Sequence, residues 1–270
     1  MIQDKWITTP SGRLFARSWT PPDAKPGAAP IVLLHDSLGC VELWRDFPAR
    51  LARTSGRTVI AYDRLGFGKS APYPGTLPRG FIGEEARGGF AALREQLGLE
   101  RFVAFGHSVG GGMAVECAAA YPAGCDAVVT ESAQAFVEQR TLDGIREAQR
   151  AFAQPGQLDR LRKYHGDKAE WVLGAWVNTW LSDEFRDWNL DRSLARVRCP
   201  LLALHGDRDE YGSSRQPERI VAHAAGPTRL TILPECGHVP HREHERSVLS
   251  AVGTFLASLD RSPLSGALTG

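Results

Sequence analysis

Short apolar runs recur along the chain, and longer segments of mixed polarity lie between them. Each run is four or five residues long, which suits a strand, and is mostly apolar. Strands that are apolar on both faces are typical of a parallel sheet buried between two layers of helices. Six runs have this character: residues 31–34, 58–62, 102–105, 127–130, 201–204 and 229–233.

The intervening segments predict helices, for example over 84–97 and 113–121. Regular alternation of strand and helix predicts an α/β fold, in which a mostly parallel sheet carries helices on both faces. Before the first run, residues 5–8 and 14–19 flank the turn-like Pro10-Ser-Gly12 and predict an N-terminal hairpin.

One connection is far longer than the others. More than sixty residues separate Ser132 from Val197, which exceeds the usual length of a crossover in such a sheet. We therefore expect an inserted helical cap with helices near 142–152 and 168–181. The cap divides the chain into a first core part, the cap itself and a second core part that ends in a frayed tail over 261–270. The expected boundaries are 1–132, 133–196 and 197–270.

Four of the seven tryptophans lie in the expected cap. Large aromatic rings usually form a core, so packing of the cap's own helices accounts for at least half of these four. The others are candidates for the roof of a pocket. The four residues are Trp171, Trp176, Trp180 and Trp188.

The composition indicates a globular protein whose partner is a small molecule. A hydrophobic content of 43% suits a substantial core, and 32 Lys and Arg against 31 Asp and Glu give a formal net charge of +1. That balance favours neither nucleic acid nor an anionic membrane as a partner. It does not predict the oligomeric state.

The cysteines and the N-terminus together predict a cytoplasmic location. Five cysteines are scattered without Cys-x-x-Cys spacing, which argues against a disulfide framework and a zinc ribbon. The start lacks a basic segment followed by an apolar one, and no apolar stretch reaches the roughly eighteen residues that a membrane helix needs.

Residues capable of nucleophilic catalysis follow four of the apolar runs. The carboxyl ends of parallel strands face a common crevice, so we expect these residues to meet there. The four segments are His35-Asp-Ser-Leu-Gly39, His107-Ser108, His205-Gly-Asp-Arg-Asp209 and Pro234-Glu-Cys-Gly-His238.

Ser108 lies in Gly106-His-Ser-Val-Gly110, a Gly-x-Ser-x-Gly pattern directly after an apolar run. In such a nucleophile elbow the serine adopts a strained backbone conformation, and glycines avoid collisions with the adjacent strands. The next helix starts at the serine, so its unpaired N–H groups favour negative charge there. We therefore interpret Ser108 as a nucleophile.

Together these segments resemble the α/β-hydrolase family along the whole chain, in the family's order of nucleophile, acid and histidine. Gly206-x-x-Asp209 is similar to the acid loop, and Gly237-His238-x-Pro240 is similar to the histidine loop. The segment Asp63-Arg-Leu-Gly-Phe-Gly-Lys-Ser70 is similar to a structural motif of the family. The capped, esterase-like branch of the family resembles this sequence more than any single enzyme does.

A serine hydroxyl needs a base with a pKa near 7, and His238 is the candidate. The side chain of His107 is expected to point away along the strand end. The histidine in turn needs a carboxylate that holds its tautomer. Asp209 fits the position of the family's acid, whereas Asp207 is expected to bond within its own loop. Glu131 also follows a strand and stays an alternative acid.

The oxyanion of an acyl transfer needs two backbone N–H donors. Val109, which follows the nucleophile, is expected to supply one, and Ser37 is the best match for the other. The family commonly has His-Gly in that loop, but this chain has His35-Asp36. Asp36 is therefore expected either to bond within the loop or to touch the substrate.

Metal and nucleotide sites are not predicted. His241 and His244 follow His238, but Pro240 disfavours a regular helix there, and we expect both histidines to be exposed loop or helix-start residues. Gly68-Lys-Ser70 looks like the end of a P-loop, yet the earlier glycine that the motif requires is replaced by Asp63. No dinucleotide fingerprint follows the first strand of an α/β unit. We therefore expect no cofactor.

These residues predict a cofactor-free serine hydrolase that cleaves a small or medium, largely apolar ester through an acyl-enzyme. The same triad supports lactone opening, carbon–carbon bond hydrolysis, acyl transfer and perhydrolysis, and the fold does not choose among them. A ligand-binding or signalling protein on this scaffold is the alternative from another class, because some receptors that resemble the family keep an intact triad.

Overall fold

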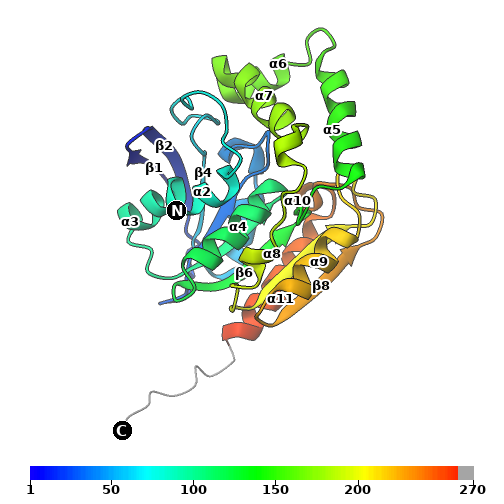
Figure 1. Ribbon diagram of the computed structural model, residues 1–270. Coiled ribbons are helices and arrows are strands. Elements are labelled where there is room, and N and C mark those ends of the chain that lie inside the picture. The colour runs from blue at the N-terminus through cyan, green and yellow to red at the C-terminus, as the bar shows by residue number, and fades with distance from the viewer. Residues whose placement is uncertain (261–270) are drawn as a thin grey trace.

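An eight-stranded sheet runs through the centre of the protein (Figure 1). The computed structural model describes residues 1–260. The strand order is β1-β2-β4-β3-β5-β6-β7-β8; β1 and β2 run antiparallel to their neighbours and β3 to β8 are parallel. The strands are β1 (Ile2–Thr9), β2 (Gly12–Trp19), β3 (Ile31–Leu34), β4 (Val59–Tyr62), β5 (Phe102–His107), β6 (Cys125–Glu131), β7 (Leu201–Gly206) and β8 (Thr228–Leu233).

The strands confirm the predicted fold class. All six apolar runs are parallel strands, and the expected hairpin is formed by β1 and β2. Alternate residues of a strand point to opposite faces of the sheet. In β3, Val32 and Leu34 accordingly join the core on one face, while Ile31 and Leu33 join the core on the other. Both faces of the central strands are therefore buried.

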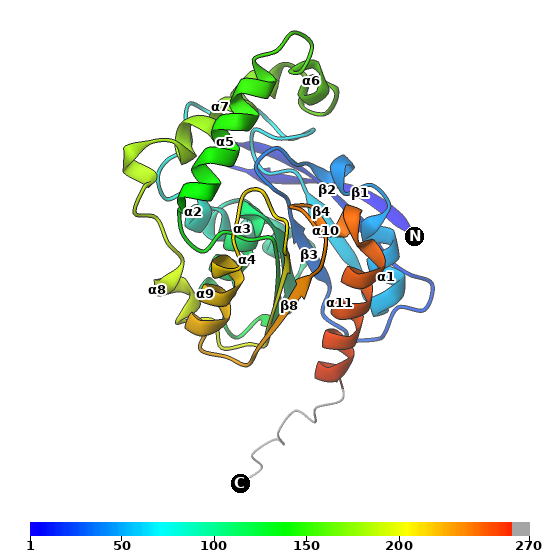
Figure 2. The ribbon, with the colours of Figure 1, turned by 90° about the vertical axis from the view of Figure 1, so that its right-hand side faces the viewer.

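Helices cover both faces of the sheet, as Figure 2 shows. One face carries α1 and α11, which contact each other. The other carries the helices whose residues share a core with α4. The first layer is α1 (Phe47–Ser55) and α11 (Glu245–Asp260), and the second is α2 (Phe81–Arg87), α3 (Gly89–Leu97), α4 (Val109–Ala120), α8 (Asp191–Leu194) and α9 (Arg215–His223).

The long connection between β6 and β7 is helical, and its residues 139–180 lie above the carboxyl edge of the sheet (Figures 1 and 2). Its helices are α5 (Gln139–Phe152), α6 (Asp159–His165) and α7 (Ala169–Trp180), followed by α8, which contacts α4 and α9. The division into core and cap at 132 and 196 stays a prediction. The expected frayed tail over 261–270 lies outside the described residues.

The helix predicted over 84–97 is two helices. The helix α2 ends at Arg87 and α3 begins at Gly89, with Gly88 at φ −103° and ψ −99° between them. Two consecutive glycines lower helix propensity and tolerate this conformation, so the chain bends there. The bend leads the chain from α2, which contacts α4, to α3, which contacts β1.

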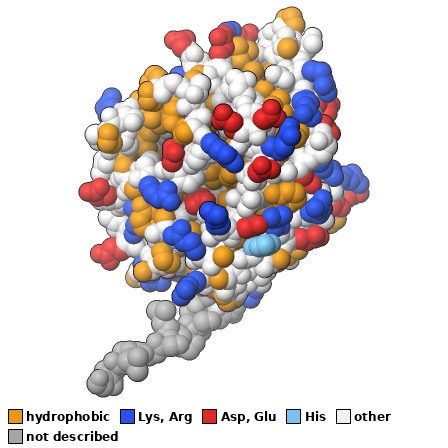
Figure 3. Space-filling model, in the orientation of Figure 1, with side chains coloured by type: hydrophobic (Ala, Val, Ile, Leu, Met, Phe, Trp, Pro, Cys, Tyr) orange, Lys and Arg blue, Asp and Glu red, His pale blue; other side chains and the backbone are white. Residues whose placement is uncertain are grey.

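Acidic and basic side chains are interspersed on the face shown in Figure 3. Within residues 1–260, no helix is long and apolar enough to cross a membrane.

Candidate active site

Ser108 occupies a sharp turn between β5 and α4. Its backbone has φ 55° and ψ −125°, a region that non-glycine residues seldom adopt. A Cβ atom on Gly106 would lie 1.9 Å from the carbonyl oxygen of Gly110, and one on Gly110 would lie 2.1 Å from that of Leu34. Both flanking glycines are therefore required by close backbone contacts, as the Gly-x-Ser-x-Gly pattern predicted.

Ser108 and His238 line one cavity of about 130 Å³ at the carboxyl edge of the sheet. Both side chains are largely buried, with exposed fractions of 7% and 9%. The loop after β3, the loop after β6 and helices α5 and α7 complete the wall. The other lining residues are Asp36, Ser37, Leu38, His107, Gln134, Thr141, Ile145, Trp176, Trp180, Tyr211 and Val239.

Asp209 is the hydrogen-bond partner of His238. The Nδ1 atom of His238 is 2.9 Å from each carboxylate oxygen of Asp209. The backbone N–H groups of Tyr211 and Gly212 donate to Oδ1 of Asp209, at 2.8 and 3.1 Å. The carboxylate is thus held in place by its own loop, and it holds the imidazole with Nδ1 facing inward.

The electrostatics of Asp209 favour its charged form. Burial alone would raise the pKa of this carboxyl group, but the charge and hydrogen bond of His238 act in the opposite direction, and the net effect lowers its pKa. An ionised Asp209 fixes the proton of His238 on Nδ1, so Nε2 carries the lone pair that a general base needs.

The loop after β3 places Ser37 on the cavity wall. The carboxylate of Asp36 accepts the N–H of Leu38 at 2.8 Å, which is the turn-forming bond that aspartates often make with the residue two positions on. Val109 is the first residue of α4, and the first N–H groups of a helix lack partners within the helix. Ser37 thus shares the cavity with Ser108, and Val109 follows Ser108 directly; their role as oxyanion donors stays a prediction.

Two cavity residues that contact Ser108 or His238 were not singled out by the sequence. Gln134 is 4% exposed, and its Oε1 accepts the hydroxyl of Ser108 at 3.4 Å. The ring of Tyr211 lies edge-on against the ring of His238, with centroids 4.8 Å apart. Tyr211 follows Asp209 by two residues, which is a usable signal. Gln134 belongs to the irregular segment after β6, where no motif marks it.

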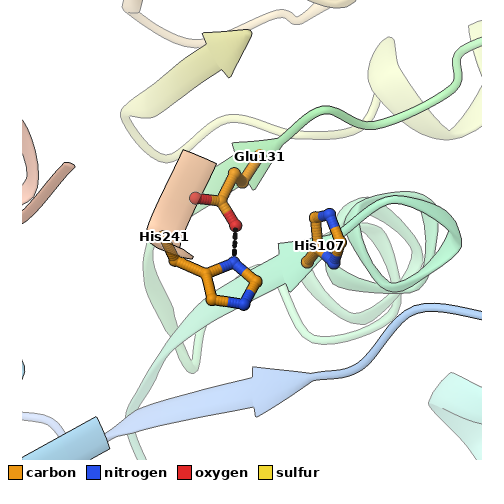
Figure 4. Close-up of side chains that lie close together, drawn as sticks. All are labelled: His107, Glu131 and His241. Carbon is orange, nitrogen blue, oxygen red and sulfur yellow. Dashed lines mark hydrogen bonds and ion pairs between the residues drawn. The ribbon is translucent and has the colours of Figure 1, made fainter. Parts of the chain in front are cut away.

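The other carboxylates that follow strands have other partners. Glu131 Oε2 accepts Nδ1 of His241 at 2.6 Å (Figure 4), and Oδ1 of Asp207 accepts the N–H of Cys236 at 3.4 Å. The structure therefore brings Asp209, and neither alternative, to His238. Asp207 was expected to bond within its own loop, but Cys236 belongs to the loop after β8. The expectation that His241 is exposed is wrong, since it is 4% exposed.

The burial of His241 follows from the short helix α10 (Pro240–Glu243) that carries it. This helix turns the side chain toward the carboxyl end of the sheet, where the ring packs against Trp44 and Phe47 at centroid distances of 4.7 and 5.3 Å.

His107, Glu131 and His241 are residue types that can bind a metal ion. Their candidate ligand atoms lie within 4.8 Å of one another (Figure 4). Their hydrogen bonding does not suit that use. His241 gives Nδ1 to Glu131, and the two ring nitrogens of His107 face Asp36 and the carbonyl of His238. We therefore do not identify these residues as metal ligands.

Comparison with known proteins agrees with this geometry. The family model described as alpha/beta hydrolase fold matches residues 29–177, more than half of the chain. The chain belongs to the α/β-hydrolase family. The match spans β3 to α7 and includes Ser108 but neither Asp209 nor His238, so the placement of those two residues comes from the structure.

The relatives of this α/β hydrolase cover most of its length. The human serine hydrolase BPHL is 29% identical over 225 residues, which are 78% of this chain and 73% of that protein. A 2-hydroxy-6-oxononadienedioate/2-hydroxy-6-oxononatrienedioate hydrolase of Comamonas testosteroni is 23% identical over 263 residues, 87% of this chain and 90% of that protein. These relatives support hydrolysis as the activity, and their names differ in substrate.

Solved structures share the fold. The crystal structure of proline iminopeptidase from Mycobacterium smegmatis aligns with a TM-score of 0.69 at 22% identity, over 96% of this chain and 99% of that one. A likeness at this identity concerns the architecture and leaves the reaction open.

Proposed function

We propose that this α/β hydrolase is a serine hydrolase that cleaves small, largely apolar esters or related acyl substrates and needs no cofactor. The observation that carries the proposal is the bond between Asp209 and His238, together with the cavity that His238 and Ser108 both line. The strained elbow presents the hydroxyl, and a buried carboxylate orients the histidine.

The reaction follows from these positions. Oγ of Ser108 attacks the acyl carbon while its proton passes to Nε2 of His238, and the carbonyl oxygen takes the negative charge. His238 then gives the proton to the leaving group as the scissile bond breaks. Water, deprotonated by His238, releases the acid from the acyl-enzyme. Asp209 stays ionised and stabilises the imidazolium at both stages.

The negative oxygen of each tetrahedral intermediate is placed between the N–H groups of Ser37 and Val109. Val109 also begins α4, so the positive end of the helix dipole faces this oxygen. Preorganised donors of this kind cost no reorganisation during the reaction. In known cases each donor lowers the activation barrier by roughly 3 kcal/mol.

The cavity favours a small acyl or leaving group. Its volume of about 130 Å³ is below the roughly 300–1,000 Å³ of pockets for drug-sized ligands. Trp176, Trp180 and Ile145 form an apolar wall, so an alkyl group gains from burial there. A small-molecule substrate with a short apolar group is therefore the proposed partner.

A panel of acyl esters of graded chain length tests this function. Wild type should hydrolyse short-chain esters and react with a fluorophosphonate at Ser108. The Ser108→Ala and Asp209→Asn variants should lose roughly 10⁴-fold of turnover, because the nucleophile and the tautomer of the base are lost. Asp207→Asn is the matched control and should stay within about threefold, because this carboxylate accepts the N–H of Cys236 and is not bonded to His238.

The outcome separates the proposal from its competitors. An equal loss in Asp207→Asn, or a larger loss in Glu131→Gln than in Asp209→Asn, contradicts the assignment of the acid. Labelling of Ser108 with slow turnover and tight retention of product would instead indicate a ligand-binding protein. Turnover of amides or lactones in preference to esters would change the proposed substrate class and leave the proposed mechanism unchanged.

A further inference from the structure

His107 is buried in the middle of the candidate active site, yet the proposed mechanism does not use it. It is the last residue of β5, directly before Ser108, and is 1% exposed. Its ring lies 5.1 Å from the ring of His238 and 5.0 Å from that of His241, measured between centroids. A polar ring in such a place must find partners for both nitrogens.

Both partners of His107 accept hydrogen bonds and cannot donate them. Nε2 is 2.8 Å from the backbone carbonyl oxygen of His238. Nδ1 is 3.3 Å from Oδ2 of Asp36. A neutral imidazole has one N–H and one lone pair, so it would direct a lone pair at one of these two oxygens.

We propose that His107 is a doubly protonated, positively charged imidazolium that links the loop of the catalytic base to the oxyanion loop. One N–H holds the main chain of His238, and the other pairs with Asp36. Asp36 in turn accepts the N–H of Leu38 and thereby sets the turn that presents Ser37. His107 acts through these groups and is therefore a positioning residue.

The charges around His107 favour its cationic form. The groups that face it are Asp36 from the loop after β3, Glu131 from the end of β6, His238 from the loop after β8 and His241 from α10. Burial alone would lower the pKa of His107, but Asp36 above all, with Glu131 and the carbonyl of His238, raises it to about 9. One oxygen of Glu131 is buried without a hydrogen-bond partner, which adds to the negative potential.

His241 does not compensate that negative charge. Its Nδ1–H donates to Glu131, and burial lowers the pKa of His241 below its ordinary value. His241 is therefore neutral near pH 7, and His107 is the cation among these buried groups. This explains why a carboxylate stands in the oxyanion loop: Asp36 balances the charge of His107.

The stability that protonated His107 contributes depends on pH over a defined range. The pKa of His107 is raised from 6.5 in the unfolded chain to about 9 in the fold. The stabilisation is therefore complete below pH 6.5 and is lost as the pH rises through about 9. Loss of the proton on Nδ1 frees the Asp36 side, and the oxyanion loop loses one of its two anchors.

The test combines a spectroscopic and a kinetic measurement on the full chain. In a protein with 15N-labelled histidine, NMR at pH 7.5 should show His107 with both N–H protons, assigned by the loss of these signals in His107→Gln. In wild type, the rate at which a fluorophosphonate labels Ser108 should fall on the alkaline side with a midpoint near pH 9. Asp36→Asn should move that midpoint down by one pH unit or more, and His107→Gln should abolish it.

Each result decides the proposal. A single N–H on His107 at pH 7.5, or the same alkaline midpoint in wild type and Asp36→Asn, overturns it. If His107→Gln does not fold, the shift of the signals in Asp36→Asn supplies the assignment. The kinetic part rests on the proposed function, whereas the NMR part does not: a wild type that is not labelled at Ser108 contradicts the serine hydrolase, and the protonation of His107 is still measured.

Discussion

At the scale of single residues, the hydroxyl of Ser108 bonds to a residue outside the proposed triad. In the described structure it donates to Oε1 of Gln134, at 3.4 Å. The distance is long for an O–H···O bond, so this contact is weak. Attack on a substrate requires the hydroxyl to turn toward His238, and a weak competing bond makes that step easy.

Two substitutions of Gln134 test this competition. Gln134→Glu should slow fluorophosphonate labelling of Ser108 by about tenfold or more at pH 7.5, because a carboxylate makes a stronger, charge-assisted bond to the hydroxyl and repels the developing oxyanion. Gln134→Ala removes the weak bond and should change the rate by less than about threefold. Labelling kinetics and circular dichroism of both variants provide the measurement. A larger loss in the alanine variant would instead assign Gln134 a contact with the reacting group.

The elbow at Ser108 and the pairing of Asp209 with His238 could be predicted, because chain order and backbone chemistry mark these positions. Ser108 is marked by the glycines that its φ of 55° and the adjacent carbonyls require. Asp209 and His238 follow strands that meet at one edge, and their mutual bond fits that placement. The pairing of Asp36 with His107 was not predictable, because it depends on where side chains from two separate strands point.

At the scale of elements, the strands were predicted well and the details of the helices less well. Six apolar runs predicted six parallel strands because burial on both faces leaves a plain signal. The bend at Gly88 and the short helix α10 were missed, since tertiary packing decides how a chain uses a glycine pair or a proline. Because α10 was not predicted, His241 was expected at the surface, whereas it lies beside Glu131.

The long connection after β6 contacts the site through defined interactions. Thr141 of α5 donates its hydroxyl to the carbonyl of Tyr211 at 2.6 Å, and a Cβ on Gly144 would lie 2.9 Å from the ring of Tyr211. His165, at the end of α6, accepts the N–H of Gly68 at 2.9 Å and lies 3.0 Å from the carbonyl of Leu38. These helices are thereby attached to the acid loop and the oxyanion loop.

The two tryptophans of α7 that line the cavity should behave differently when truncated. Trp176 is half-buried and lies edge-on to Tyr211 at 5.8 Å, so Trp176→Ala should shift preference toward longer acyl chains with little loss of stability. Trp180 is 3% exposed and packs against Phe185 and Trp188. Trp180→Ala should therefore cost roughly 3–5 kcal/mol of unfolding free energy.

Chain-length profiles with p-nitrophenyl esters and urea denaturation separate the two effects. Trp171→Ala is the matched control, because Trp171 stacks on Tyr73 and donates to the carbonyl of Gly75, away from the cavity residues. An unchanged profile in Trp176→Ala, together with a large loss of stability, would mean that this ring serves only to pack the helices.

At the scale of the whole molecule, the candidate active site and the ion pair that joins α11 to the N-terminal half lie at opposite edges of the sheet. The cavity is at the carboxyl edge. Arg57 precedes β4 at the amino edge, is 5% exposed, and forms an ion pair with Asp260 at the end of α11. Its Nη1 also donates to the carbonyl of Ala29 at 2.8 Å. A helix from the end of the described chain is thus joined to the N-terminal half.

Removal of Asp260 should lower stability without altering the chemistry. Asp260→Asn leaves the buried guanidinium of Arg57 without its counter-charge, so the unfolding free energy at pH 7.5 should fall by about 1–3 kcal/mol. This is less than the roughly 3–5 kcal/mol of a fully buried pair, because the Asp260 side chain is 31% exposed. Lys25→Ala removes the exposed partner of the same carboxylate and should cost at most about 1 kcal/mol. Urea denaturation measures both, and labelling of Ser108 in the folded variants should match wild type because the ion pair touches none of the cavity residues. A change in labelling rate with unaltered stability would show that the amino edge influences the site, and the two edges would then have to be treated as coupled.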